Sequence, residues 1–455
     1  MPRRLAMLLA RLGPTPARFT AALDAIVAVL ARHGVAASFP TTAVALARHP
    51  RPLQRLVDQG IEVAVHSFHH VDLSRQPPAS QRDQVMAARQ AFAQHRIPAV
   101  GFRAPYLRWN HDLLRLLFVQ GFTYDSSTCA LWPVLSPEQL ATPAIQTVLA
   151  FYRPLDAGRA PVLPQLLLEG LVEIPVSLPD DEMLMDRLRL PISHVAAAWR
   201  AMLQASHQAG ELFVLQLHPE RGREGAAALD AVLTAARALR PAVWVATLAE
   251  VAEWWKIRPQ CQIHLHSLGA GRWELNVSAP AAARVLAQGP LILETAGDDV
   301  SPGRPAPTGS APTLALGEDE GPADARRRVH PPRFQALAWP HVTEVTASSF
   351  VVRSDVRPFV GLAPGSSQEL LGFLRQQGYV VEISPERAHY PIYFDQASFD
   401  PATHARSVIQ QVEAPDAPLL RFSRWPNAAA SALVISGDID SLTLWDYLWR
   451  LIEGS

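Results

Sequence analysis

Two aspartates near the end of the sequence stand where metal or acid–base chemistry is expected. In "SALVISGDIDSL", residues 432–436 form an apolar, strand-like run that stops at Gly437, and Asp438 and Asp440 follow it. Carboxylates at the end of a buried strand hold a metal ion or transfer protons. The alternative is a solvated turn in which Asp440 or Ser441 caps the next helix. The choice depends on which other groups the fold brings beside them.

Two histidines follow another predicted strand. In "VAVHSFHHVDL", His66 ends the strand and His70 lies four residues later. In a tight turn or a first helical turn, imidazoles at this spacing can face one metal ion, although the same spacing often occurs without one. We expect His69 at the surface or behind the ligands, and Asp72 either to orient a ligand or to cap a helix.

Three more polar side chains come at strand ends. Arg103 in "GFRAPYLRWN" has the planar fork that holds a carboxylate, while Asp125 in "GFTYDSS" and His218 in "LFVLQLHPER" follow apolar runs. Taken singly, a surface ion pair or a structural role explains each of them. Together they place four polar motifs at the carboxyl ends of strands, the face where parallel α/β sheets and barrels build their sites.

The elements that position these residues alternate between helix and strand over residues 15–258. The first helix is typical: "TPARFTAALDAIVAVLARHG" has Thr15 as a cap, Pro16 at the first helical position and Gly34 as a stop. Apolar runs such as "IEVAV" and "ELFVLQL" alternate with helical patterns along this range. Repeated strand–helix units indicate a parallel sheet, open or closed into a barrel.

The sequence divides into five parts by composition. After the α/β region at 1–258 comes a short β extension at 259–300, followed by a Pro/Gly-rich linker or mobile loop at 301–332. Residues 333–430 read as an α+β accessory domain. Residues 431–455 form a closing strand–helix unit that is more like the first half than like its neighbours.

The order and content of the motifs resemble the polysaccharide deacetylases of the NodB-homology type (carbohydrate esterase family 4), over about residues 15–258. Three motifs of that family, H-[ST]-x-x-H, R-x-P-Y and a strand ending L-x-H-P, are matched by residues 66–70, 103–106 and 217–219, with Leu215 before the last. The resemblance implies a distorted (β/α)7-type barrel of the polysaccharide deacetylase kind, plus a smaller α+β region.

Two family motifs are missing or altered. The fourth carries an Asp and a Trp that flank the general acid, and here "YDSSTCALWP" offers only a loose match, which makes Asp125 and Trp132 the candidates. The first motif is a strand ending in Asp-Asp or Asp-x-Asp before the first helix. At that place "LAMLLARLGPTP" has Ala10, Arg11 and Leu12 instead of acids, so the base and one metal ligand are absent.

The C-terminal strand has what the N-terminal stretch lacks. "LVISGDIDSLTL" matches the Asp-x-Asp form of the first motif, which would make Asp438 the catalytic base and Asp440 a metal ligand. A barrel accepts a strand from either end of its chain, and a partner chain is a second source. A third interpretation is that 431–455 begins another, truncated domain.

The resemblance implies metal-assisted amide hydrolysis that removes an N-acetyl or other N-acyl group from an amino sugar or polysaccharide. Asp440, His66 and His70 would hold a divalent metal, most simply zinc, with cobalt, nickel and manganese as alternatives. Asp438 would take a proton from water, and His218 would protonate the leaving amine.

Other residues receive supporting roles. From the resemblance, Arg103 would orient Asp438, the backbone N–H of Tyr106 would hold the oxyanion, and Asp125 would tune His218. Among the other side chains, Trp132 and Asp180 are candidates for substrate contact.

Two further groups have competing interpretations. Glu173, Asp180 and Asp181 in "EIPVSLPDDE" are expected as solvated loop acids, with sugar binding as the alternative. Trp254 and Trp255 are expected in the core rather than stacked on a sugar ring.

The bulk composition excludes several classes of protein. A net charge of −1 over 455 residues gives no reason to expect nucleic acid or a membrane surface as a partner, and no run approaches the ~18 apolar residues of a membrane span. The start, "MPRRLAMLLARLG", imitates a signal peptide but is broken by Arg11, so we expect a cytoplasmic protein. Cys129 and Cys261 indicate neither a disulfide framework nor a zinc knuckle.

Two other functions stay open at this stage. One is an inactive, deacetylase-like protein that binds a glycan or a metal. The other is a related hydrolase of cyclic amides or ureides. A homodimer is also compatible with the sequence.

Overall fold

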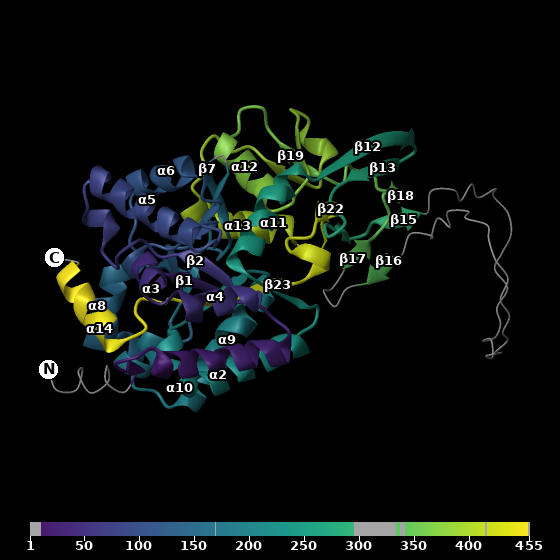
Figure 1. The fold of residues 1–455 in the computed structure, drawn as a ribbon. Coiled ribbons are helices and arrows are strands. Elements are labelled where there is room, and N and C mark those ends of the chain that lie inside the picture. The colour runs from purple at the N-terminus through teal and green to yellow at the C-terminus, as the bar shows by residue number, and fades with distance from the viewer. Residues whose placement is uncertain (1–10, 169, 295–333, 337–341, 415, 454–455) are drawn as a thin grey trace, which may run out of the picture.

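The computed structural model describes most of the chain (Figure 1). The linker predicted at 301–332 lies outside the described residues, as does the part of the predicted first-motif strand before Arg11. The described residues are 11–168, 170–294, 334–336, 342–414 and 416–453.

Parallel strands form the centre of the molecule. Each is short and fully or largely buried, as expected for a sheet that helices cover on its outer face. The strands of this sheet that build the barrel are β1 (Ser38–Thr41), β2 (Glu62–Val65), β3 (Gly101–Phe102), β4 (Tyr124–Asp125), β5 (Cys129–Leu131), β8 (Leu171–Glu173), β9 (Val176–Leu178), β10 (Leu212–Leu217) and β23 (Ser431–Gly437).

The sheet returns on itself. From β10 the order of parallel neighbours runs through β23, β1, β2, β3 and β4. β4 then pairs with β8, β5 pairs with β9, and β9 pairs with β10. β4 and β5 are two parts of one interrupted strand, and so are β8 and β9. When each of these pairs is counted once, the closed circuit has seven strand positions. This is the distorted (β/α)7-type barrel that the sequence predicts.

Helices cover the outside of the barrel. α2 packs beside α10, and α10 packs beside α9 (Figure 1). The helices of this region are α2 (Ala17–His33), α3 (Ala43–Arg48), α4 (Pro50–Asp58), α5 (Pro78–Gln94), α6 (His111–Val119), α7 (Pro137–Leu140), α8 (Pro143–Tyr152), α9 (Ile192–Ala209), α10 (Gly222–Ala238) and α11 (Leu248–Ile257). Three short strands extend the sheet, β6 (Leu155–Asp156), β7 (Gln165–Leu168) and β11 (Val243–Ala246).

The first of these helices differs from the prediction at its start. Pro16 is the N-cap, and no side chain caps the helix, so the predicted Thr15 cap is wrong. The helix begins one residue later than the pattern indicates, which leaves Thr15 outside the capping position. Gly34 ends the helix as predicted, because its φ of 56° is a left-handed conformation that glycine adopts readily.

A second region has three small sheets and two helices among its described residues. β14 pairs with both β17 and β22, so the ranges 259–300 and 333–430 share a sheet. Its elements are β12 (Gln262–Gly269), β13 (Arg272–Ser278), β14 (Val285–Gln288), β15 (Ile292–Glu294), β16 (Phe334–Ala336), β17 (Val342–Val345), β18 (Ser349–Arg353), β19 (Val360–Leu362), β20 (Val381–Ile383), β21 (Ile392–Phe394), β22 (Leu419–Phe422), α12 (Gln368–Gln376) and α13 (Pro401–Val412).

Strand β23 occupies the barrel position between β10 and β1. It runs beside β10 along its length and meets β1 at Ser38 and Ser436. All seven of its residues are buried, which is typical of a central parallel strand. At Gly437 a Cβ atom would lie 2.7 Å from the carbonyl oxygen of Leu217, so only glycine fits. Helix α14 (Leu444–Glu453) follows this strand.

Candidate active site

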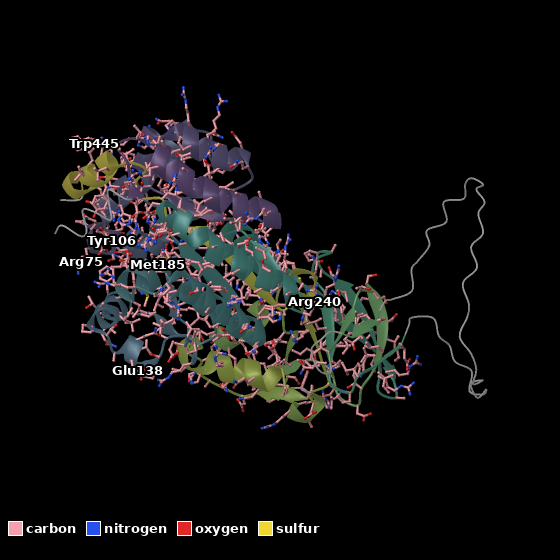
Figure 2. All side chains as sticks on the ribbon, turned by 90° about the horizontal axis from the view of Figure 1, so that it is seen from below. Arg75, Tyr106, Glu138, Met185, Arg240 and Trp445 are labelled. Atoms are coloured by element: carbon pink, nitrogen blue, oxygen red, sulfur yellow. The ribbon has the colours of Figure 1, made fainter. Side chains whose placement is uncertain are left out.

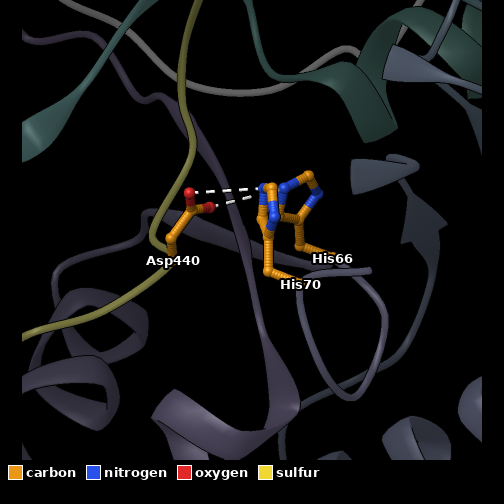
Figure 3. A group of neighbouring side chains, drawn as sticks. All are labelled: His66, His70 and Asp440. Atoms are coloured by element: carbon orange, nitrogen blue, oxygen red, sulfur yellow. Dashed lines mark ion pairs between the residues drawn. The ribbon is translucent and has the colours of Figure 1, made fainter. Parts of the chain in front are cut away.

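Three potential metal ligands meet at the carboxyl ends of β2 and β23 (Figure 3). His66 follows β2, His70 lies in the next turn, and Asp440 follows β23. One ligand atom from each residue lies within 4.8 Å of the other two. The Nε2 atoms of His66 and His70 are 3.5 Å and 3.3 Å from the carboxylate of Asp440. Two imidazoles and a carboxylate form a donor set that zinc accepts.

The hydrogen bonds around His66 leave one ring nitrogen free for a cation. Its Nδ1 lies 2.8 Å from the carbonyl oxygen of Arg103, so Nδ1–H donates and Nε2 keeps its lone pair. Nε2 of His66 and Oδ1 of Asp440 are buried polar atoms without a hydrogen-bond partner. Such atoms are costly when they stay unsatisfied. The residues present therefore fit a divalent cation.

Charge and burial favour the ligand forms of the other two side chains. Burial lowers the pKa of His70 well below its usual 6.5, with Arg450 and His66 adding to the effect against the opposing charge of Asp440. Burial alone would raise the pKa of Asp440, but His70 and Arg450 hold it below its usual value. A neutral imidazole and an ionised carboxylate are the forms that bind metals.

The loop between the two histidines is a tight turn. Ser67 takes a left-handed conformation with a φ of 66°. Gln84 on α5 holds the turn, because its Oε1 accepts hydrogen bonds from the Ser67 hydroxyl and from the backbone N–H of His69. His69 itself is half-buried behind the ligands. The strain at Ser67 is thus maintained by a neighbouring helix.

Asp438 is held from two sides. Arg103, which is fully buried, donates to Oδ1 at 2.7 Å, and Gln216 on β10 donates to Oδ2 at 3.0 Å. Arg103 is itself fixed by Ser126 and Ser436. The geometry in which Arg103 orients Asp438 is therefore present. Gln216 was not singled out in the sequence, since a single Gln within an apolar run carries no motif.

His218 pairs with an aspartate other than the one expected. Its Nδ1 and backbone N–H each lie 2.7 Å from the carboxylate of Asp181. Burial opposes a charge on His218, but Asp181 outweighs it and raises the pKa well above 6.5. Asp181 follows β9, which neighbours β10 in the barrel. A signal existed in the sequence, because Asp181 also comes just after a strand.

Asp125 and Trp132 lie away from His218. The Asp125 carboxylate accepts from the Ser127 hydroxyl, and burial together with Glu173 raises its pKa well above 3.8. Trp132 is buried, and its Nε1 donates to Ser177. We expected Asp125 to tune His218, but the carboxylate hydrogen-bonded to His218 belongs to Asp181, and Asp125 is hydrogen-bonded to Ser127.

The acids around β8 and β9 are buried, and the expectation of solvated loop acids is wrong. Glu173, Asp180 and Asp181 expose 5%, 3% and 2% of their surfaces. Glu173 accepts from the backbone N–H of Thr128, and Asp180 accepts from that of Met183. Burial and the neighbouring carboxylate of Asp181 raise the pKa of Asp180 to about 7. These acids satisfy backbone donors inside the barrel wall.

Other predicted residues have the roles that packing gives them. Trp254 and Trp255 are buried in the core, as expected. Asp72 caps the short 3₁₀ turn at Leu73–Arg75 by accepting from Ser74, which selects capping from its two predicted roles.

Tyr106 stands beside the ligands. Its backbone is left-handed, with a φ of 61°, and its ring packs edge-on against His70 with centroids 4.4 Å apart. The guanidinium of Arg450 lies 5.8 Å from the centre of the same ring. Arg450, on α14, also donates to Oδ2 of Asp440 at 2.6 Å. Nothing in the sequence placed Arg450 at the site.

A cavity of about 700 Å³ opens beside Asp440 and Arg450. Asp438, Asp440 and His218 all line it, so the candidate base, ligand and acid share one space. Met185 and Tyr106, labelled in Figure 2, come from this part of the molecule. The charged residues in the lining are Arg11, Glu182, Asp186, Arg187, Arg189, His218, Glu220, Arg221, Asp438, Asp440 and Arg450.

None of the helices in the described part of the chain combines the length and the apolar character that a membrane crossing needs.

Part of the chain is similar to known proteins. The family model described as polysaccharide deacetylase matches residues 13–124. A chitooligosaccharide deacetylase from Bradyrhizobium sp. (strain ANU 289) is 34% identical over 148 residues, which cover 31% of this chain and 63% of that relative. The chain thus spans less than two thirds of this relative.

Two further similarities extend over more of the chain. A chitooligosaccharide deacetylase from Sinorhizobium fredii (strain NBRC 101917 / NGR234) is 29% identical over 216 residues, covering 46% of this chain and 87% of that relative. A crystal structure assigned to the polysaccharide deacetylases, from Mycobacterium smegmatis, covers 51% of this chain and 76% of its own at 24% identity and a TM-score of 0.40. The matched segment and the two relatives support a place for this part of the chain in the polysaccharide deacetylase family of the NodB-homology type.

Proposed function

We propose that this protein is a metal-dependent deacetylase that removes an N-acetyl or other N-acyl group from an amino sugar or polysaccharide. We further propose that its own strand β23 supplies the base and one metal ligand. One observation carries the proposal: Asp440 lies within 3.5 Å of His66 and within 3.3 Å of His70, while Asp438 beside it is held by Arg103. The two chitooligosaccharide deacetylases among the relatives support the substrate class.

His66, His70 and Asp440 would hold the divalent ion. When bound, such an ion lowers the pKa of a water molecule to about 7 and polarises an acyl oxygen. The proposal does not depend on which metal it is, because zinc, cobalt, nickel and manganese all accept imidazole and carboxylate ligands.

Asp438 accepts the proton of the attacking water. Its two oxygens are fixed by Arg103 and Gln216, so the carboxylate faces the cavity in one orientation. A positioned base of this kind typically contributes about 10²–10⁴ in rate. The backbone N–H of Tyr106 serves as a donor to the developing oxyanion.

His218 gives its proton to the leaving amine. Asp181 accepts the hydrogen of Nδ1, which leaves Nε2–H as the proton to be donated. The raised pKa keeps the ring protonated at neutral pH, the form that a general acid needs. Asp181 is thus a positioning residue that replaces Asp125 in the role first assigned to it.

The test uses two conservative substitutions directly after β23 and one control. Asp440→Asn should lose bound zinc, whereas Asp438→Asn should retain zinc and lose about 10²–10⁴ in the rate of deacetylation of N-acetylglucosamine oligomers. Glu182→Gln, in the same cavity but paired with Arg187, should change neither quantity. Zinc content is measured by elemental analysis, and released acetate is assayed directly.

Three results would refute the proposal. If zinc content and deacetylation both survive the two aspartate changes, β23 does not supply the site. If zinc binds but only allantoin-like cyclic amides are hydrolysed, the reaction class is wrong. If zinc binds and neither substrate reacts, the protein is a deacetylase-like binding protein.

A further inference from the structure

A guanidinium lies on the same atoms that a cation would need. Arg450 donates to Oδ2 of Asp440 at 2.6 Å, and its other terminal nitrogen is 3.5 Å from Nε2 of His70. Both acceptors belong to the candidate metal cluster. The Tyr106 ring lies against the same guanidinium. Arg450 therefore contacts, with one positive charge, two of the three ligand residues that are available to a divalent ion.

The two cations exclude each other at this place. A metal ion on this cluster would need the Nε2 lone pair of His70, which Arg450 now contacts, and would share the Asp440 carboxylate with Arg450. Like charges a few ångströms apart repel strongly in a partly buried setting. The Asp440–Arg450 pair exposes 24% and 22% of its side chains, so water can reach both and the pair can exchange. The pair of Asp438 with Arg103 is more enclosed, because Arg103 exposes none of its side chain and Asp438 exposes 9%.

The first turn of the helix that carries Arg450 is held firmly. Oδ2 of Asp446 accepts from the backbone N–H groups of Leu442 and Thr443 and contacts His49, so the first turn of α14 is fixed to the barrel. Farther along, Trp445, Leu448 and Trp449 are exposed, with 57%, 40% and 52% of their surfaces accessible; Trp445 is labelled in Figure 2. Tyr447 packs against the barrel core, and Arg450 follows it on the same helix.

We propose that Arg450 is a latch: it occupies the cation's place on Asp440 and His70, and cation binding displaces it and loosens the later turns of α14. The inference rests on the proposed function, because it takes the metal site at His66, His70 and Asp440 as given. The latch and a supporting role predict effects of Arg450 on metal affinity that have opposite signs. A residue that merely orients Asp440 strengthens metal binding, whereas a latch weakens it.

The first measurement is zinc affinity by calorimetry on the full chain after removal of metals with a chelator. Arg450→Met keeps the length and helix propensity of the side chain and removes its charge. It should bind Zn²⁺ about ten- to a hundred-fold more tightly than the wild type, the range expected for the loss of one competing charged hydrogen bond. Arg187→Met, an arginine in the same cavity that pairs with Glu182, should leave the affinity unchanged.

The second measurement is amide hydrogen exchange over residues 444–453. In the wild type, adding Zn²⁺ should lower protection in this segment. In Arg450→Met the protection should be low already and should not respond to Zn²⁺. Circular dichroism of each variant confirms that the barrel is folded.

The outcomes distinguish a failure of the latch from a failure of the proposed metal-dependent function. Weaker or unchanged Zn²⁺ binding in Arg450→Met refutes the latch, while zinc that is lost in Asp440→Asn still supports the metal site. Unchanged exchange in the wild type also refutes the latch. If neither the wild type nor Arg450→Met binds Zn²⁺, the latch and the proposed function both fail.

Discussion

Strand β23 and helix α14 are neighbours in the chain but differ in how they are attached. The strand is buried along all seven residues and pairs with β10 on one side and with β11 and β1 on the other. The helix is fixed at its first turn and exposes Trp445 and Trp449 on its outer face. The strand brings Asp438 and Asp440 to the barrel, and the helix brings an arginine against one of them. Under the proposals above, one segment supplies both a rigid part of the candidate site and an exchangeable part.

The largest difference is expected between the two arginines that hold the aspartates. Arg103→Met should cost about 3–5 kcal/mol of unfolding free energy, because it leaves Asp438 buried and unpaired. Arg450→Met removes a partly exposed pair and should cost less than about 1 kcal/mol. Urea unfolding followed by circular dichroism measures both. Equal losses would show that the two aspartates are held alike.

The second comparison concerns apolar packing. Ile435 in β23 is fully buried, and Ile435→Ala should cost about 2–5 kcal/mol because it leaves a cavity in the barrel. Leu448 in α14 is 40% exposed, and Leu448→Ala should stay within about 0.5 kcal/mol of the wild type. Thermal unfolding of the pair tests this. A cost at Leu448 that matches the one at Ile435 would mean that another surface covers the helix.

The smallest effect is expected at the cap of α14. Asp446 and Thr443 exchange hydrogen bonds between side chain and backbone, so Asp446→Ala should cost about 0.5–2 kcal/mol. The loss should appear as faster amide exchange in residues 444–453 and leave the exchange of β23 unchanged. If β23 also becomes less protected, strand and helix unfold as one unit. Trp445→Ala, an exposed neighbour, serves as the control.

Much of the site could be predicted because its residues follow strands. His66, His70, Arg103 and His218 each come directly after an apolar run or in the turn beyond it. In a parallel barrel all such ends meet on one face, so spacing along the chain is converted into proximity.

The remaining parts depend on which strands are neighbours. Asp181 reaches His218 because β9 lies beside β10, and Gln216 reaches Asp438 because β10 lies beside β23. Neither pair of neighbouring strands can be recognised from a local sequence pattern. Asp125 ends β4 and Asp181 comes just after β9, and only the barrel order separates the two acids. The burial of Glu173 and Asp180 also needed the structure, since acids after a strand are usually solvated.

The place of β23 in the barrel has a consequence for how the protein folds. The hydroxyl of Thr42 donates to the backbone oxygen of Asp440 across 398 residues of sequence. Contacts so distant along the chain form slowly, because a long loop must close before they contribute. Until residues 431–437 are present, β1 and β10 have open hydrogen-bonding edges, and such edges invite pairing with other chains. The sheet therefore closes in the same step that brings in Asp438 and Asp440. During synthesis, the barrel stays incomplete while the second region is being made.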